Sequence, residues 1–224
     1  MRTVALLPMK AHSERIPGKN FREFAGKPLF RWMLDRLLAI DEIDLVVINT
    51  DGRQLLEHHG LRESKRVMIR DRREEICGDF VSMNIVLADD VENVDADNYL
   101  MTHTTNPLLS IETIRHSIEN FMTAMRARRC DSLFTVNRVQ TRFYKSDGTA
   151  VNHDPNKLVR TQDLEPWFEE NSNLYLFTRD SFRATKSRIG ERPLMLETDK
   201  LESLDIDTPR DWGLAVLAAK YLYP

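Results

Sequence analysis

A loop near the start of the sequence carries residues suited to binding a phosphorylated ligand. Three cationic side chains, Lys10, Arg15 and Lys19, lie close together, and the polar residues Ser13 and Asn20 accompany them. Lysine and arginine neutralise phosphate charge, and the glycine before Lys19 lets the backbone approach a ligand closely. The segment matches neither the GxxxxGK[ST] nor the GxGxxG pattern, so a solvated polar loop is the alternative interpretation.

A second group of candidate residues lies in the segment Leu204-Asp205-Ile206-Asp207. Alternate residues of an extended segment share one face, so both carboxylates enter one cleft if a strand continues through Asp207. Because Mg²⁺ prefers one or two carboxylates together with substrate phosphates and water, we predict Asp207 as a metal ligand. Asp205 then binds the same metal directly or through water, or supports the groups that bind it. Alternatively, Asp207 only caps the following helix, where Asp is favoured, and Asp205 is solvated.

Polar residues also follow several short apolar runs of the first half of the chain. These polar segments are 50–52, 70–73 and 102–107, and they include Asp51, Arg72 and His103. Ligands of open parallel sheets bind at the carboxyl ends of the strands, so we expect these segments to line one site. For His103 alone, a hydrogen-bonded structural role is the alternative interpretation.

The elements that would position these residues alternate between apolar runs and helical periodicity. The predicted strands are 3–7, 45–49, 66–69, 99–102 and 132–136, and the predicted helices are 28–40, 54–59, 82–88 and 111–126. This order predicts an α/β fold, a Rossmann-like three-layer sandwich with helices on both faces of a mostly parallel central sheet. We expect the chain, 1–224, to form a single domain.

The pattern changes after this sheet. Ser146-Asp147-Gly148 is a turn signal between the two strand-like halves of 143–151, which predicts a β-hairpin. The irregular stretch from about 139 to 170 is expected to leave the sheet as an excursion. In α/β domains such excursions build lids or contacts between subunits.

The last part of the chain returns to regular structure. Residues 173–177 predict a strand, and 204–206 predict a final short strand. The last helix is predicted over 209–221, with Asp207 or Thr208 as its N-cap and Pro209 in its first turn.

Composition excludes several classes of protein. The 224 residues are 42% hydrophobic, and 32 basic against 35 acidic residues give a net charge of −3. This balance argues against a nucleic-acid partner, and no apolar run has the length of a membrane span or of a signal peptide. The two cysteines, Cys77 and Cys130, make neither a disulfide scaffold nor a zinc site, so we expect reduced thiols and a cytoplasmic location.

The segment LLPMKAHSERIPGKNFREFAGKPLFRWMLDRLL resembles the opening of the CMP-sugar synthetases, the cytidylyltransferases of sialic, nonulosonic and octulosonic acids. The matching loop residues are Ser13, Arg15, Pro17, Lys19 and Asn20, followed by Gly26-Lys27-Pro28-Leu29. Further matches in the same order are Thr50-Asp51, Arg72, Asp79, Ser82, Thr105-Asn106-Pro107-Leu108, Arg160, Gln162-Asp163-Leu164, Asn171-Ser172-Asn173-Leu174-Tyr175 and Leu204-Asp205-Ile206-Asp207-Thr208-Pro209. The resemblance therefore covers nearly the whole chain.

Departures from the family pattern concern the identity of the sugar. The segment 13–19 is closer to the octulosonate branch, whereas Asn20, the Thr105-Asn106-Pro107-Leu108 loop and the paired aspartates are closer to the sialic and nonulosonic branch. Lys10 replaces a usual arginine, Arg73 a usual proline, and His103 a usual glutamine. In the resembled enzymes that glutamine position contacts the acidic sugar.

The resemblance implies a cytidylyltransferase, an enzyme of the nucleotidyltransferase class. It joins CTP to an acidic 2-keto-3-deoxy sugar, namely sialic acid or another nonulosonic acid, and releases pyrophosphate. The implied catalytic residues are Lys19 and Arg15 at the triphosphate and Asp207, which with Asp205 holds Mg²⁺. The other implied nucleotide-binding residues are Lys10, Ser13, Asn20, Arg72, Asp79 and Ser82. The implied sugar-binding residues are His103, Thr105, Asn106, Arg160, Gln162 and Tyr175.

The resemblance also implies a homodimer, because in this family the excursion reaches the partner subunit. Arg142, Lys145 and Arg160 then meet the carboxylate of an eight- or nine-carbon sugar in the neighbouring site. Two alternatives stay open: another nucleotidyltransferase of the same fold with a phosphorylated acceptor, or a non-catalytic protein that binds nucleotide sugars.

Overall fold

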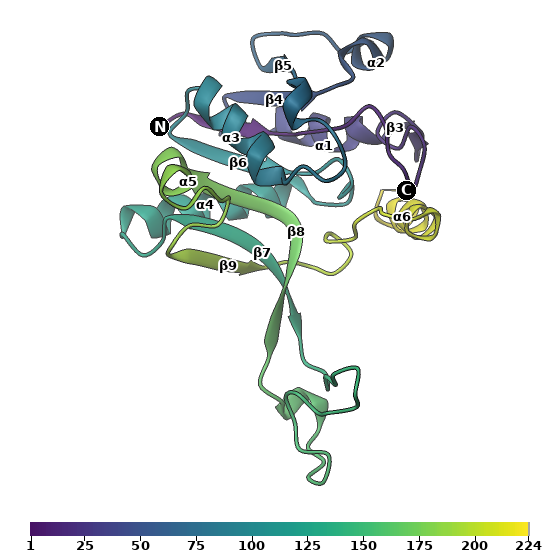
Figure 1. The fold of residues 1–224 in the computed structure, drawn as a ribbon, viewed down its shortest axis with the longest axis vertical. Coiled ribbons are helices and arrows are strands. Elements are labelled where there is room, and N and C mark those ends of the chain that lie inside the picture. Colours follow the sequence, from purple (N-terminus) through teal and green to yellow (C-terminus); the bar gives the residue numbers. More distant parts are fainter. Residues whose placement is uncertain (224) are drawn as a thin grey trace.

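Seven strands form one sheet in the order β5-β4-β1-β6-β8-β7-β9 in the computed structural model, which describes residues 1–223 (Figure 1). Their bounds are β1 Thr3–Leu6, β4 Leu45–Thr50, β5 Val67–Asp71, β6 Asn98–Thr102, β7 Ser132–Val139, β8 Trp167–Thr178 and β9 Pro193–Glu197. Neighbouring strands are parallel except where β8 pairs with β6 and with β7. The predicted α/β class with a mostly parallel sheet is confirmed.

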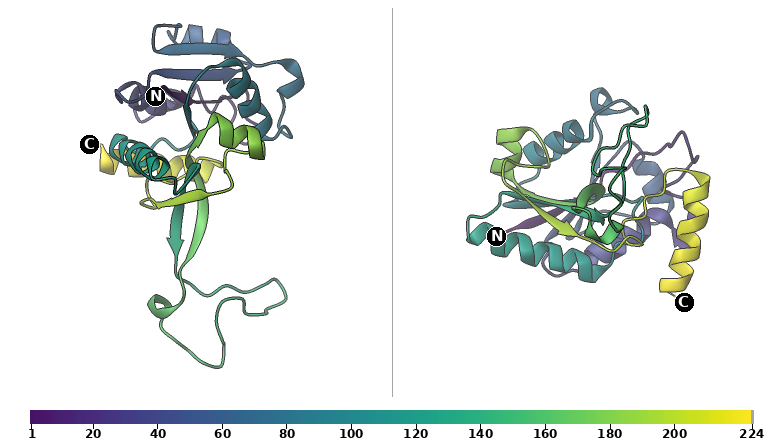
Figure 2. Two further views of the ribbon diagram at one scale, coloured as in Figure 1. Left: turned by 90° about the vertical axis from the view of Figure 1, so that its left-hand side faces the viewer. Right: turned by 90° about the horizontal axis from the view of Figure 1, so that it is seen from below.

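Helices cover both faces of this sheet and complete three layers (Figure 2). The helices are α1 Leu29–Leu38, α2 Arg53–His58, α3 Met83–Asn93, α4 Ile111–Arg126, α5 Arg179–Thr185 and α6 Pro209–Leu222. Phe30 of α1 and Phe121 of α4 belong to one core cluster, and Leu87 of α3 and Phe182 of α5 belong to the second. Every residue of β1, β4 and β6 is buried, which explains why these strands read as unbroken apolar runs.

A third core cluster joins the two ends of the chain. The short strands β2 (Glu23–Phe24) and β3 (Lys27–Pro28) form a hairpin just before α1. Phe24 meets Trp212 of α6 edge to face, with ring centroids 5.5 Å apart. Ile16 and Ile206 are buried in the same cluster. Packing of α6 therefore brings the segment before it against the first loop of the protein.

The strands β7 and β8 extend beyond the sheet and carry an arm, residues 140–166, that projects away from the sheet layers (Figures 1 and 2). At the predicted hairpin, the amide of Lys145 donates to the carbonyl of Thr149, and Tyr144 and Ala150 form an isolated antiparallel bridge. The turn signal is thus correct, but one bridge replaces the predicted pair of strands. A 3₁₀ turn at Thr161–Asp163 precedes β8.

The predicted strand at 204–206 is wrong. Residues 201–203 form a turn, and 204–207 have no regular structure. The amide of Ile206 donates instead to the carbonyl of Thr105, 2.9 Å away, so this segment is tied to the loop after β6 and does not join the sheet. Because no strand forms here, the expectation that strand alternation places Asp205 and Asp207 on one face does not apply. Thr208, not Asp207, is the N-cap of α6 and forms a capping box with Asp211.

Candidate active site

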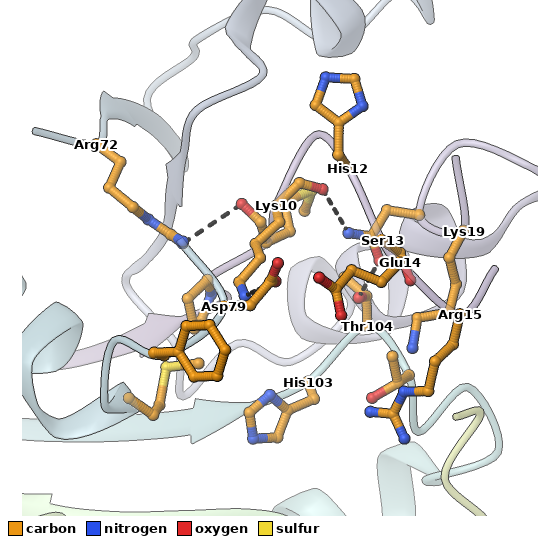
Figure 3. A pocket seen from close by; sticks show the side chains of 16 residues that line it. Lys10, His12, Ser13, Glu14, Arg15, Lys19, Arg72, Asp79, His103 and Thr104 are labelled. Atoms are coloured by element: carbon orange, nitrogen blue, oxygen red, sulfur yellow. Dashed lines mark hydrogen bonds and ion pairs between the residues drawn. The ribbon is translucent and has the colours of Figure 1, made fainter. Parts of the chain in front are cut away.

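A pocket of about 460 Å³ opens at the carboxyl ends of β1 and β6 (Figure 3). The predicted site residues that line it are Lys10, Ser13, Arg15, Lys19, Asn20, Arg72, Asp79, His103 and Thr105. Figure 3 shows Arg72 at one side of the pocket and Arg15 and Lys19 at the other. Sequence positions far apart therefore converge here, as the rule for parallel sheets predicts.

The first loop owes its shape to two glycines. Gly18 has a φ of +65°, and the amide of Lys19 bonds to the carbonyl of Ile16 in the turn that it makes. A Cβ at Gly52 would lie 2.9 Å from that of Ala11. The amide of Ala11 also donates to Asp51, at 2.6 Å. The Thr50-Asp51-Gly52 segment thus acts as a support for the first loop, and it does not line the pocket.

Asn20 ties the pocket walls together. Its Nδ2 donates to the carbonyl of Lys10 at 2.8 Å, and its Oδ1 accepts from Oγ1 of Thr104 at 2.7 Å. Asn20 is buried, so both halves of its amide are already used within the protein. Thr104 was not among the predicted site residues, although it lies in the polar segment that follows β6.

An ion pair closes one side of the pocket. Nζ of Lys10 lies 2.7 Å from Oδ1 of Asp79, and this bond holds the pKa of Asp79 below its usual range. Phe80, the next residue, is fully exposed and also lines the pocket. Ser82 does not line it; it stands directly before α3 and is exposed to solvent.

Arg72 is the most deeply placed cation of the site. Its Nε donates to Oδ1 of Asn49 at 2.9 Å, and its Nη2 donates to the Asn49 carbonyl at 2.8 Å. Burial lowers the pKa of Arg72 below its ordinary value. Sequence reasoning missed Asn49, because it ends an apolar run and reads as an ordinary strand residue.

Lys19 and Arg15 meet the aspartates that precede α6. Nζ of Lys19 donates to the carbonyl of Ile206 at 2.6 Å and lies 3.8 Å from Oδ1 of Asp207. Nη2 of Arg15 lies 3.0 Å from the same oxygen. Burial lowers the pKa of Lys19, while the charge of Asp207 opposes that shift. The two predicted groups of the sequence, cationic and acidic, are therefore one group in space.

Asp205 lies next to this group, close enough to Asp207, Lys19 and Thr105 for all three to act on its carboxylate. Loss of water around the carboxylate raises the pKa of Asp205 above its ordinary value. Within residues 1–223 no three His, Cys, Asp or Glu side chains cluster as a complete metal site. Two carboxylates without a third ligand match the way Mg²⁺ binds when substrate phosphates supply the other ligands.

His103 reaches the pocket from the end of β6 (Figure 3). Burial lowers its pKa to about 4, and the positive charges of Arg188 and Lys19 add to the shift. The imidazole is therefore neutral near pH 7 and offers one donor and one acceptor to a ligand.

Besides His103, Thr105 lines the pocket, whereas the other four predicted sugar-binding residues do not. Tyr175 and Asn106 are buried. Burial raises the pKa of Tyr175 to about 12. Arg160 and Gln162 belong to the arm, where Arg160 forms a 2.7 Å ion pair with Asp163.

Arg188 was not predicted and lies near this part of the site. Its guanidinium carbon is 3.9 Å from the ring centroid of Tyr175, and its Nη2 is 3.5 Å from Glu170. No sequence pattern marks Arg188, because it lies in an irregular segment between α5 and β9.

Comparison with known proteins gives consistent matches. The family described as Cytidylyltransferase matches residues 4–214. The chain is 30% identical to the CMP-N,N'-diacetyllegionaminic acid synthase of Legionella pneumophila, over 96% of this chain and 94% of that protein. It is 23% identical to the pseudaminic acid cytidylyltransferase of Campylobacter jejuni, over 98% of this chain and 97% of that protein.

Solved structures share the fold at low identity. A CMP:2-keto-3-deoxy-manno-octonic acid synthetase complexed with CTP aligns with a TM-score of 0.67 at 16% identity, covering 99% of each chain. The 4-diphosphocytidyl-2C-methyl-D-erythritol synthase of Anaerococcus prevotii aligns with a TM-score of 0.69 at 11% identity, covering 100% of this chain and 99% of that chain. No helix within residues 1–223 has the length and apolar character needed to cross a membrane.

Proposed function

The chain belongs to the cytidylyltransferase family and is a nucleotidyltransferase, and we propose that it transfers CMP from CTP to an acidic nonulosonic sugar. The products are the CMP-sugar and pyrophosphate. The names of the legionaminic and pseudaminic acid relatives support this sugar class, because both align over nearly the whole chain.

One observation carries the proposal: Lys19 and Arg15 both lie within ion-pair distance of Asp207 at the edge of the pocket. Cations and a carboxylate at one place suit a metal-bound triphosphate, which needs positive charge for its oxygens and an acidic ligand for its metal. Arg72, on the other side of the pocket, supplies a further cation for the nucleotide.

The proposed reaction is an in-line displacement at the α-phosphate. The anomeric hydroxyl of the sugar gives up its proton to solvent, and its oxygen forms a new O–P bond with the α-phosphate while the bond from that phosphorus to pyrophosphate breaks. Arg15 and Lys19 would offset the charge that develops on the departing pyrophosphate. Positioning and charge stabilisation then account for most of the acceleration, as in phosphoryl transfer generally.

The two aspartates suit the metal that this chemistry uses. Asp207 would hold Mg²⁺, and Asp205 would hold it directly, through water, or by orienting the first ligands. A bound Mg²⁺ neutralises phosphate charge and lowers the pKa of a coordinated hydroxyl. One carboxylate oxygen of Asp207 already forms ion pairs with Arg15 and Lys19, so positive charge is stabilised at its position.

The sugar would lie beyond His103 and Thr105, which line the pocket. Because the arm projects from its own subunit, we propose that in a homodimer it completes the neighbouring site. Arg142, Lys145, Arg160 and Gln162 of the arm would then contact the sugar acid. We also propose a cytoplasmic location, which the two unpaired cysteines support.

A substrate panel tests the reaction. Pyrophosphate release would be measured with CTP, ATP, GTP and UTP, each combined with nonulosonic acids, octulosonic acids and phosphorylated sugars or alcohols. We expect release with CTP, Mg²⁺ and a nonulosonic acid. Release only with phosphorylated acceptors would replace the proposal with the first alternative, and nucleotide-sugar binding without turnover would favour the second.

Mixing two variants of reduced activity tests the shared site. Lys19→Ala alters the pocket, and Arg160→Ala alters the arm. A mixed dimer has one site with a native pocket and a native arm, so activity should return after the two chains are mixed and reassembled. Failure to recover activity in a dimer confirmed by light scattering would contradict a shared site, and a monomer would contradict the dimer itself.

A further inference from the structure

Arg72 keeps its positive charge although it is buried. Its side chain bonds to neutral acceptors only: the Oδ1 and carbonyl oxygen of Asn49, at 2.9 and 2.8 Å, and the carbonyl of Met9, at 3.4 Å. A buried arginine usually has a carboxylate partner. Among residues 1–223, however, no carboxylate lies within ion-pair distance of this guanidinium. Its charge therefore stays available to an anion in the pocket.

Asn49 has a second partner on the opposite side of its amide. Its Nδ2 donates to Oδ1 of Asp90 at 2.8 Å and makes a longer contact of 3.5 Å with Oδ2 of Asp89; Asn49 and Asp90 are fully buried. Asp90 in turn lies 3.4 Å from Nη1 of Arg70, and its other oxygen has no hydrogen-bond partner in the described structure. The chain of contacts thus runs from a core carboxyl through one amide to the cation of the pocket.

Only an amide of this size satisfies both neighbours. The guanidinium of Arg72 can only donate, whereas the carboxylate of Asp90 can only accept, so Asn49 must turn its oxygen to one and its NH₂ to the other. The carboxylate therefore fixes the orientation of the amide, and the amide separates that carboxylate from the cation.

From this geometry we infer that Asn49, oriented by Asp90, is a positioning residue for nucleotide binding. It holds the guanidinium of Arg72 at the pocket wall without an ion pair that would compete with the nucleotide phosphates. The inference rests on the proposed function, in which Arg72 contacts CTP, and adds two core residues to the nucleotide site that do not themselves line the pocket.

The variant Asn49→Asp tests the role of the amide. It places a carboxylate against Arg72 and also next to Asp90, so we expect the KM for CTP to rise roughly tenfold or more while kcat changes less. Asn98→Asp is the matched control, because Asn98 is a buried strand asparagine at the opposite end of β6. Equal losses of thermal stability with a raised KM only in Asn49→Asp would support the inference.

A second pair of variants covers the case in which Asn49→Asp does not fold. Asp90→Leu removes the shorter of the two acceptor contacts of the Asn49 amide, at 2.8 Å against 3.5 Å to Asp89, whereas Asp90→Asn keeps an oxygen that accepts the same hydrogen bond. We expect a KM for CTP raised about threefold or more in Asp90→Leu and restored to near the wild-type value in Asp90→Asn. A native KM in Asp90→Leu, or in a folded Asn49→Asp, would overturn the inference.

A double variant separates this inference from the function on which it rests. If Asn49 acts through Arg72, the KM effects of Asn49→Asp and Arg72→Ala will not add in the combined variant. Additive effects would mean that Asn49 acts independently. By contrast, a wild-type protein that neither binds nor turns over CTP would refute the proposed function itself, before any variant is compared.

Discussion

Nζ of Lys19 donates a 2.6 Å hydrogen bond to the carbonyl oxygen of Ile206, a residue 187 positions further along the chain. The bond spans two segments that the third core cluster packs together, since Ile16 and Ile206 are both buried in it. Lys19 is therefore placed by the core as well as by its own loop. Its ammonium group is held in a fixed position before any ligand binds, which favours charge stabilisation.

Replacing Lys19 by alanine should lower kcat/KM by roughly tenfold or more, about 1.4 kcal/mol of transition-state stabilisation. The reason is the loss of a preorganised cation at the proposed triphosphate site. Steady-state kinetics with CTP and Mg²⁺ would measure the effect. Lys220→Ala, at an exposed position of α6, is the control for loss of a positive charge alone. Near-native kinetics in Lys19→Ala would remove this residue from the site.

Asp207→Asn should raise the Mg²⁺ concentration needed for half-maximal activity, because an amide binds the cation more weakly than a carboxylate. The measurement is a magnesium titration of the rate at saturating CTP. Asp180→Asn is the control, since Asp180 is an exposed acidic residue in the first turn of α5. It should leave the magnesium dependence unchanged. An unchanged titration in Asp207→Asn would exclude it as a ligand.

Asp90 should make the protein less stable as the pH rises. Burial raises its pKa from 3.8 to about 6, so the folded protein retains a proton that the unfolded chain releases between these values. The free energy of unfolding should therefore fall through this range by up to about 3 kcal/mol, relative to Asp90→Asn. Urea unfolding of both proteins at several pH values measures the difference. Parallel pH curves for the two proteins would contradict the shifted pKa.

His103 should stay neutral across the pH range in which the enzyme is assayed. Because its pKa is lowered to about 4, its ring resonances should not shift between about pH 5.5 and 8, and should titrate only below. NMR of the histidine rings, assigned with His103→Gln, checks this. For the same reason His103→Gln should leave the shape of the pH–rate profile unchanged. A His103 titration near pH 6.5 would show that the ring is solvated.

The elements that were predictable from sequence are those whose hydrophobic pattern follows directly from which of their residues are buried. The bounds of α4 agree with the prediction from one-faced periodicity, and β1 and β4 were found because every residue is buried. By contrast, β9 is an edge strand whose residues alternate between exposed and half-buried, so no apolar run marks it. The prediction of a strand at 204–206 was wrong because an alternation of apolar and acidic residues over three positions does not reveal that the segment bonds to a loop and not to a strand.

The residues of the candidate site also divide into those that the sequence predicts and those that it does not. The cations of the first loop and Arg72 were predictable, because parallel sheets place strand ends at one edge. Asn49 was not, since its hydrogen bonds join residues that are distant in sequence. The clamp by Asn20 and the support by Asp51 were missed for a related reason: polar side chains that hold two loops together look like ligand contacts until their partners are known.

The position of β8 also dictates an order of assembly. β8 lies between β6 and β7, two strands that precede it in the chain, and it pairs antiparallel with both. Until β8 arrives, a nascent or refolding chain holds a partial sheet whose β6 edge is unpaired, and β7 has no neighbour among the strands already made. Closing this gap requires contacts between segments far apart in sequence, which slows folding and leaves open edges prone to aggregation. Insertion of β8 is thus the step at which chaperones or low temperature would be expected to improve the yield of native protein.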